Sequence, residues 1–162
     1  MLMIAVFPNI DKENAPMVLR RIVNFYQGKD VKLLMPMDSA KFFDYEAYGV
    51  EDIENHPIDM ALSIGGDGTL LGICRRLYER DIPVCGINIG TFGFLADIEL
   101  PEIESKLEKI IKGQYYFEER MLVSGFVKSG EDDERFLGHA INDVVVTKGG
   151  VARMLHLGLS VD

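Results

Sequence analysis

The sequence has few cysteines, an excess of acidic over basic residues and no long apolar run. Cys74 and Cys85 are its only cysteines, without a CxxC or Cys/His ligand spacing, which argues against a disulfide framework or a zinc site. Lys and Arg number 17 against 26 Asp and Glu, a net charge of -9 that argues against a general nucleic-acid binder. No segment has the apolar length of a membrane span, and MLMIAVFPN has neither a basic leader nor a cleavage site. We therefore expect a cytoplasmic protein with no membrane or nucleic-acid partner.

What the sequence does contain is the balance of a globular protein, with 48% apolar and 27% charged residues over 162 positions. That length suits one ordinary domain, or a small domain and part of another. Apolar runs typical of buried strands alternate with segments whose apolar residues recur at helical spacing. This order predicts an α/β fold with a mostly parallel, Rossmann-like sheet covered on both faces. Residues 38–56 have aromatics at irregular spacing and predict a variable surface segment. The expected strands are Leu2–Phe7, Val31–Met35, Asp59–Ile64 and Ile82–Ile87.

The pattern changes near Pro101. Ile103 to Ile111 has the spacing of a short amphipathic helix, and three β-rich runs follow without helices between them, which favours antiparallel pairing. We therefore predict an α/β domain over residues 1–100. Residues 101–162 are expected to form a connecting helix and the first strands of a β-rich, sandwich-like C-terminal domain. The three β-rich runs are Tyr115–Val127, Arg135–Thr147 and Met154–Val161.

The stretch MALSIGGDGTLLGICRRL, Met60 to Leu77, carries the clearest chemical signal. Its glycines follow a predicted strand and precede a predicted helix, a place where backbone N–H groups and the helix N-terminus attract a phosphate. The Rossmann fingerprint is absent because Leu71 stands where its third glycine belongs. No glycine-rich segment continues into Lys-Ser or Lys-Thr, so a Walker A loop is also absent.

Asp67 is the unusual residue of this turn. A carboxylate beside bound phosphates would be repelled unless it held a metal ion or accepted a proton from an attacking hydroxyl, and both roles belong to phosphoryl transfer. A second interpretation is purely structural, since aspartate readily shapes turns. The spacing alone leaves both interpretations open.

GGDGTLL, NIGTFGFLAD and INDVVV together resemble motifs of the NAD kinases. GGDG alone is shared with diacylglycerol and sphingosine kinases and with phosphofructokinases, whereas the second loop is more specific. The resemblance implies NAD phosphorylation at the 2′-hydroxyl of its adenosine ribose, with ATP as donor and a divalent metal such as Mg²⁺. It also implies an N-terminal α/β domain, a β-rich C-terminal domain, NAD bound between the two, and a homo-oligomer.

Carried onto this sequence, the resemblance makes Asp67 the proton acceptor and a dinucleotide contact. It implies further contacts with NAD from Gly68, Phe94, Asn142, Asp143 and Arg153. Asp143 departs from the more frequent glutamate and is one methylene shorter.

Each of these residues also has a structural interpretation. Phe94 would be a buried anchor, Asn142 and Asp143 turn caps, and Arg153 a solvated charge at a strand end.

The sequence also leaves two alternative functions open for the chain. One is a lipid kinase that shares GGDG. The other is a non-catalytic nucleotide-binding fragment, because NAD kinases continue beyond the position of Asp162.

Overall fold

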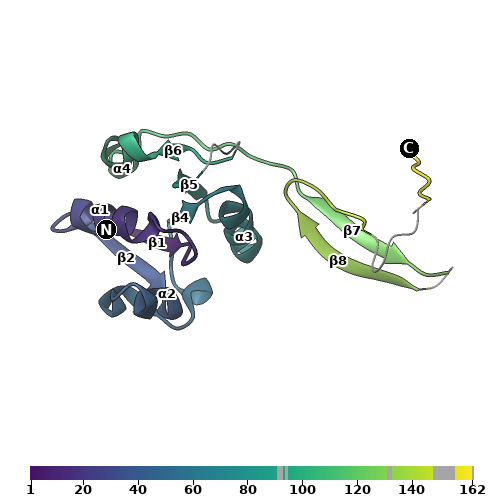
Figure 1. The fold of residues 1–162 in the computed structure, drawn as a ribbon, viewed down its shortest axis with the longest axis horizontal. Coiled ribbons are helices and arrows are strands. Elements are labelled where there is room, and N and C mark those ends of the chain that lie inside the picture. The colour runs from purple at the N-terminus through teal and green to yellow at the C-terminus, as the bar shows by residue number, and fades with distance from the viewer. Residues whose placement is uncertain (91–92, 94, 131–132, 148–155, 162) are drawn as a thin grey trace. The chain divides into compact units, whose positions relative to one another are not determined.

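A six-stranded parallel sheet organises residues 1–120 (Figure 1). The computed structural model describes residues 1–90, 93, 95–130, 133–147 and 156–161. The strand order is β3-β2-β1-β4-β5-β6, and every neighbouring pair is parallel. The predicted Rossmann-like α/β fold is therefore confirmed. The strands are β1 (Leu2–Pro8), β2 (Val31–Pro36), β3 (Gly49–Val50), β4 (Met60–Gly65), β5 (Val84–Asn88) and β6 (Ile98–Glu99).

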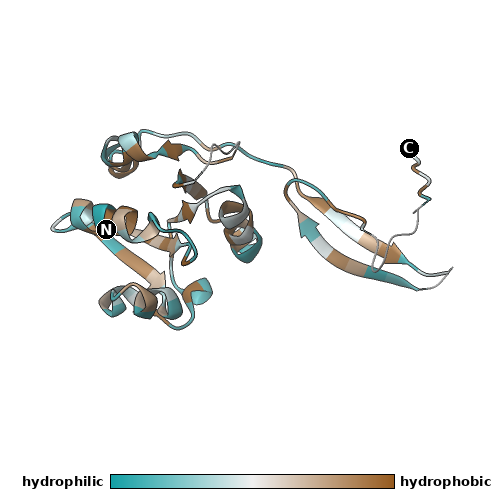
Figure 2. Ribbon diagram, in the orientation of Figure 1, coloured by the Kyte–Doolittle hydropathy of each residue, from teal (hydrophilic) through white to brown (hydrophobic). Residues whose placement is uncertain are grey.

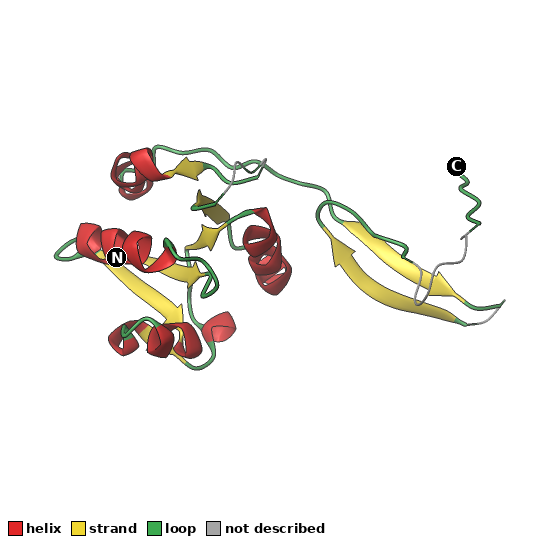
Figure 3. Ribbon diagram, viewed as in Figure 1, coloured by secondary structure: helices red, strands yellow, loops and turns green. Residues whose placement is uncertain are grey.

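Helices cover both faces of this sheet. Side chains along β1 alternate, so that Ile4 and Val6 belong to the core that contains α1 and α4, whereas Ala5 and Phe7 belong to the core that contains α3. This alternation explains why the strands are apolar throughout rather than at every second position. The helices are α1 (Ala15–Tyr26), α2 (Met37–Phe42), α3 (Asp67–Leu77) and α4 (Ile103–Ile111), shown in red in Figure 3.

Helix α1 follows the predicted pattern. Its inward residues recur at helical spacing, and Figure 2 shows hydrophobic and hydrophilic residues interleaved along the helix. The helix ends here because Gly28, directly after the Gln27 cap, adopts a positive φ of 75° that a side chain disfavours. The buried residues of α1 are Ala15, Val18, Leu19, Ile22, Val23 and Tyr26.

Residues 38–56 are more ordered than the sequence suggested. They contain most of α2, strand β3 and two short 3₁₀ helices, Glu46–Tyr48 and Ile53–Asn55. Ala40, Phe43 and Ile53 are buried, so the segment contributes to both cores. Most of the segment is exposed or half-buried, as expected of a surface segment, but its short elements were not predicted because they bury single residues and leave no periodic pattern.

The second compact unit, Met121–Asp162, contains an antiparallel hairpin of β7 (Val123–Lys128) and β8 (Glu134–Ala140). The predicted antiparallel pairing is thus confirmed, although both strands are shorter than the apolar runs. Residues 156–161, the described part of the third predicted strand, are not in a strand. Helix α4 belongs to the first unit, Met1–Arg120, where Ile103 and Leu107 are fully buried.

Candidate functional site

The carboxyl ends of β1 and β4 lie side by side in the middle of the sheet. From β1 the chain passes through α1 to β2 on one side, and from β4 it passes through α3 to β5 on the other. The strand order therefore reverses between β1 and β4. Open α/β sheets bind their ligands at such a switch point, outside the carboxyl ends of the strands. Asn9 and the turn Gly65–Gly68 both lie there.

The glycine turn delivers the chain directly into α3. Gly66 precedes the helix in an extended conformation, and its carbonyl accepts hydrogen bonds from the N–H groups of Thr69 and Leu70 at 3.0 and 3.1 Å. No side chain caps this helix start with a hydrogen bond. The first turn of α3 thus presents backbone dipoles to the switch point, as the sequence predicted for a phosphate site.

Asp67, the first residue of α3, connects the turn to the second glycine loop. Its side chain is half-buried, and its Oδ1 accepts a hydrogen bond from the N–H of Leu95 at 3.2 Å. A Cβ placed on Gly93 would lie 3.0 Å from Cγ of Asp67 and closer still to Oδ1. The loop backbone therefore fixes the carboxylate at the edge of the sheet, where a proton acceptor is useful.

Asn9 provides the corresponding connection from β1. Its side-chain Nδ2 donates to Oγ1 of Thr69 at 2.9 Å, while its backbone N–H donates to the carbonyl of Ile64 at 2.9 Å. Asn9 Oδ1 also accepts from the N–H of Asp11 at 2.9 Å. The loop after β1 is thus held against the first turn of α3.

An open hollow of about 390 Å³ lies between this loop and α3. Gly68 and Gly72 line it. A Cβ on either glycine would meet no atom of the described residues within 4 Å, and neither has a positive φ. A glycine inside a helix lowers the stability of the helix by roughly 1 kcal/mol relative to alanine. Close approach of a ligand to the helix backbone would explain why glycine occupies both positions. The remaining lining residues are Phe7, Pro8, Asn9, Pro36, Ser39, Thr69, Ile73 and Arg76.

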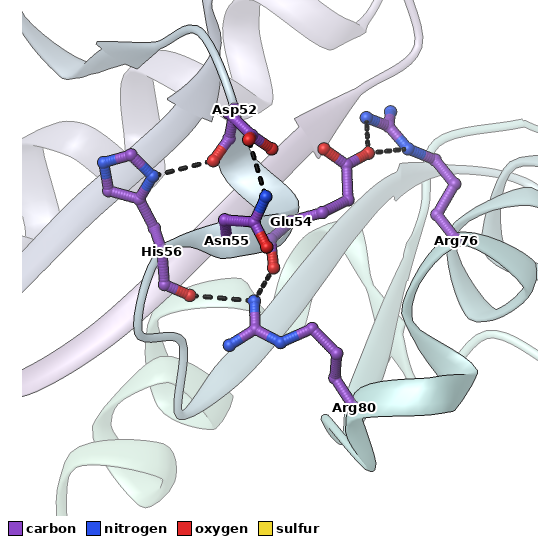
Figure 4. A network of polar contacts seen from close by, with 6 residues as sticks. All are labelled: Asp52, Glu54, Asn55, His56, Arg76 and Arg80. Carbon is purple, nitrogen blue, oxygen red and sulfur yellow. Dashed lines mark hydrogen bonds and ion pairs between the residues drawn. The ribbon is translucent and has the colours of Figure 1, made fainter.

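Arg76 is the cationic residue among those lining the hollow. Its Nε and Nη2 both donate to Oε1 of Glu54, the former at 2.8 Å (Figure 4). Its guanidinium carbon lies 5.5 Å from the centre of the Phe7 ring. The hydrogen bond from Arg76 lowers the pKa of the Glu54 carboxyl below its usual value. The pair is therefore ionised at neutral pH.

The structure brings together only part of the site predicted from the sequence. Asp67 and Gly68 share the first turn of α3 at the switch point. Asn142 and Asp143 follow β8 in the second unit, where both are exposed. Phe94 and Arg153 lie outside the described residues.

Three residues of this region were missed by the sequence analysis. Asn9 belongs to none of the three motifs, although its place at a strand end beside a glycine turn could have indicated it. Arg76 is one of several arginines near the end of a helix, where positive charge is common, so it gives no specific signal. Glu54 carried no signal, because its position opposite α3 is created by the fold.

The described part of the chain holds no cluster of three or more His, Cys, Asp or Glu residues suited to a metal ion. Asp67 is a single carboxylate at the glycine turn. Mg²⁺ in such sites is typically bound by one or two carboxylates together with the phosphates of the substrate, and Asp67 fits that arrangement. Among the described residues, no helix is both long and apolar enough to cross a membrane.

A glycine turn at the switch point of a six-stranded parallel sheet places the chain in the class of Rossmann-like α/β proteins. Residues 5–115 match the family described as the ATP-NAD kinase N-terminal domain. The chain belongs to this NAD kinase family, which confirms the resemblance seen in the three sequence motifs.

Relatives agree with this assignment. The chain is 35% identical over 159 residues to the NAD kinase of Moorella thermoacetica, covering 98% of this chain and 50% of that protein. It is 32% identical over 162 residues to the NAD kinase of Syntrophotalea carbinolica, covering 98% of this chain and 56% of that protein. The chain thus spans about half the length of the curated relatives it matches. These similarities give no support to the lipid kinase alternative.

The fold also has a counterpart among solved structures. Yeast NADH kinase, in a crystal structure complexed with NADH, superposes with a TM-score of 0.72 at 17% sequence identity, covering 88% of this chain and 47% of that one. At this identity the similarity concerns the fold.

Proposed function

We propose that this chain is the N-terminal part of an NAD kinase, which transfers the terminal phosphoryl group of ATP to the 2′-hydroxyl of the adenosine ribose of NAD. The observation that carries the proposal is the position of Asp67. Its half-buried carboxylate is held by the Leu95 N–H at the carboxyl edge of the sheet, between two glycine loops. Family membership supports the same reaction.

In this reaction Asp67 accepts the proton of the ribose 2′-hydroxyl. The hydroxyl oxygen forms a bond to the terminal phosphorus of ATP as the bond from that phosphorus to the bridging oxygen breaks, which yields NADP and ADP. A positioned base contributes roughly 10²–10⁴-fold to such a step. Because Gly93 and Leu95 restrict the carboxylate, little reorganisation is needed when the hydroxyl arrives.

The hollow beside α3 is the proposed site of the phosphoryl donor. Its lining includes the first turn of α3 and the polar side chains of Asn9, Ser39 and Thr69, which suit phosphate oxygens. Gly68 and Gly72 leave the helix backbone open to the donor. A divalent cation bound with the donor phosphates would supply charge neutralisation, and Asp67 is the carboxylate placed to approach it.

The remaining NAD contacts are proposed from family membership. Gly68 would lie beside the dinucleotide, Phe94 near its adenine, and Asn142, Asp143 and Arg153 would form hydrogen bonds with it. A homo-oligomeric assembly stays a prediction of the same origin and is testable by size-exclusion chromatography with light scattering. A cytoplasmic location stays a prediction from the sequence composition.

Asp67→Asn tests the proposed function, in the protein at the full length of its relatives. The amide is nearly isosteric but cannot accept the proton as a carboxylate does. We expect NAD affinity within about threefold of the unmodified protein and a kcat lower by roughly 10²–10⁴-fold. Asp44→Asn is the matched control, since Asp44 is exposed in a left-handed turn conformation that asparagine tolerates. An unchanged kcat for Asp67→Asn would remove the proton acceptor from the mechanism.

A further inference from the structure

The two ends of the hollow beside α3 differ in chemistry. One end is formed by the start of α3 with Asn9 and Thr69, which are polar. The other end is formed by Phe7, Ile73 and the paired Arg76. Thr69 and Arg76 are seven residues apart on one helix, a separation of about 10 Å along its axis. A donor whose phosphates lie at the polar end would therefore extend a different group toward Arg76.

The positive charge of Arg76 is already compensated. Glu54 accepts two hydrogen bonds from it through one carboxylate oxygen, and the pair keeps side-chain exposures of 46% and 38%. A paired guanidinium attracts a further phosphate weakly, because the neighbouring carboxylate repels the same phosphate. The Phe7 ring is buried and supports the guanidinium, whose exposed surface remains suited to a neutral aromatic group.

Glu54 is held in this position by hydrogen bonds to the backbone of its segment and by a hydrogen bond within that segment (Figure 4). Arg80 donates through Nη1 to the backbone carbonyls of Glu54 and His56, the latter at 2.9 Å. Within the segment, Asn55 Nδ2 donates to Asp52 Oδ2 at 2.6 Å. The 3₁₀ turn Ile53–Asn55 is thus fastened to the end of α3 and its following turn by two arginines. Glu54 consequently faces Arg76 as a fixed counter-charge.

We propose that Glu54 is a positioning residue that makes the donor site select a nucleoside triphosphate over inorganic polyphosphate. It neutralises Arg76 and keeps the guanidinium beside Phe7, where it contacts the base of the nucleotide. Polyphosphate carries negative charge along its whole length, so its distal phosphates would meet the Glu54 carboxylate without gaining a free cation. This inference rests on the proposed function insofar as the hollow binds the phosphoryl donor.

Calorimetric titration of the 162-residue chain with ATP and with long-chain inorganic polyphosphate, each with Mg²⁺, tests the proposal, because only a chain longer than the triphosphate of ATP extends from Thr69 to Arg76. The unmodified chain should bind ATP more tightly. Glu54→Gln frees the charge of Arg76 and should raise polyphosphate affinity about three- to tenfold while changing ATP affinity less than about twofold. Arg76→Gln should weaken ATP binding about fivefold and leave polyphosphate affinity within about twofold. Equal changes for both ligands, or no measurable binding of either, would overturn the proposal.

Glu104→Gln is the matched control for this titration. Glu104 also forms a paired contact with an arginine, Arg21, but on the side of the sheet covered by α1 and α4. Its replacement should leave the ratio of ATP affinity to polyphosphate affinity unchanged. Glu54→Asp, which keeps the charge, should retain most of the preference for ATP. Thermal unfolding of each variant reports whether the chain remains folded.

Steady-state kinetics at the full length of the relatives separates this inference from the proposed function. The preference is the ratio of kcat/KM with ATP to kcat/KM with polyphosphate, both with NAD as acceptor. If NAD is phosphorylated and Glu54→Gln leaves this ratio unchanged, the selectivity inference fails while the function stands. If NAD is not phosphorylated and the binding preference still responds to Glu54→Gln, the function fails while the donor-site inference stands.

Discussion

The carboxylate of Asp67 lies directly against the α-carbon of Gly93. A Cβ at position 93 would approach Cγ of Asp67 to 3.0 Å and its Oδ1 more closely, while the neighbouring Leu95 N–H donates to that same oxygen at 3.2 Å. The turn after β4 and the loop after β5 are therefore interlocked through a glycine and an acid. The second glycine loop thus helps to hold the carboxylate of Asp67 in place.

Gly93→Ala should displace the Asp67 carboxylate. Gly93 does not have a positive φ, so alanine is compatible with its backbone, and the conflict is confined to the side chain of Asp67. We expect a kcat for NAD phosphorylation lower by at least about tenfold, with thermal stability nearly unchanged. Gly90→Ala in the same loop is the control, because its Cβ would meet only Lys12 Nζ among described atoms, at 3.8 Å. Full activity of Gly93→Ala would show that the carboxylate tolerates displacement.

Gly72→Ala should separate stability from donor binding. Position 72 is inside α3, where alanine favours the helix by up to about 1 kcal/mol, and its Cβ would point into open space along the hollow. We expect a higher unfolding free energy in urea titration together with ATP affinity at least about threefold weaker. Asn24→Ala on the exposed side of α1 is the control, which should stabilise without changing ATP affinity. Unchanged ATP binding by Gly72→Ala would place the donor elsewhere.

The sequence was sufficient to predict the parallel sheet because each strand and helix has its own repeating pattern. Val18, Ile22 and Tyr26 recur at helical spacing, and all three are buried in α1. The hairpin of β7 and β8 followed from adjacent β-rich runs without a helix between them. The small elements within residues 38–56 could not be predicted, since Ala40 and Ile53 each enter a core as single residues.

Only part of the candidate site could likewise be predicted from the sequence. Asp67 and Gly68 were recognised because they belong to a contiguous motif. The ion pair of Glu54 and Arg76 joins residues 22 positions apart, and nothing in either local sequence specifies the other. Such contacts arise from strand order and helix placement, so they become visible only when β4 and α3 are in place.

A third prediction concerns the ion pair that connects α1 to α4. Arg21 donates through Nε and Nη2 to the two carboxylate oxygens of Glu104 at 2.7 and 2.5 Å, and through Nη1 to the Leu100 carbonyl at 2.8 Å. The hydrogen bond from Arg21 lowers the pKa of the Glu104 carboxyl in the folded protein. The resulting stability is fully present above the unfolded pKa of the carboxyl and is lost as pH falls through the lower folded pKa.

Glu104→Gln should therefore lower the unfolding free energy at pH 7 by about 0.5–1 kcal/mol, a modest amount because the pair is partly exposed. The difference from the unmodified chain should shrink as urea titrations are repeated at successively lower pH, because the carboxyl of Glu104 becomes neutral as pH falls through its lowered folded pKa. Glu51→Gln, at an exposed carboxylate without an ion pair among the described residues, should show no such convergence. A pH-independent difference would mean that Glu104 acts through packing rather than through its charge.

The fourth prediction is that replacing Tyr26 by phenylalanine raises the stability of the protein. Its hydroxyl is buried without a hydrogen-bond partner among the described residues, and burial raises the pKa of the phenol above its usual value. A buried donor left unsatisfied costs about 1–3 kcal/mol, whereas the aromatic ring contributes to the core between α1 and the sheet. Tyr26→Phe removes the hydroxyl and keeps the ring, so the unfolding free energy should rise by about 1 kcal/mol. Tyr48→Phe, at a partly exposed hydroxyl, should stay within about 0.5 kcal/mol. Destabilisation by Tyr26→Phe would instead mean that the hydroxyl is hydrogen-bonded inside the core, and that its buried position contributes to the packing of α1.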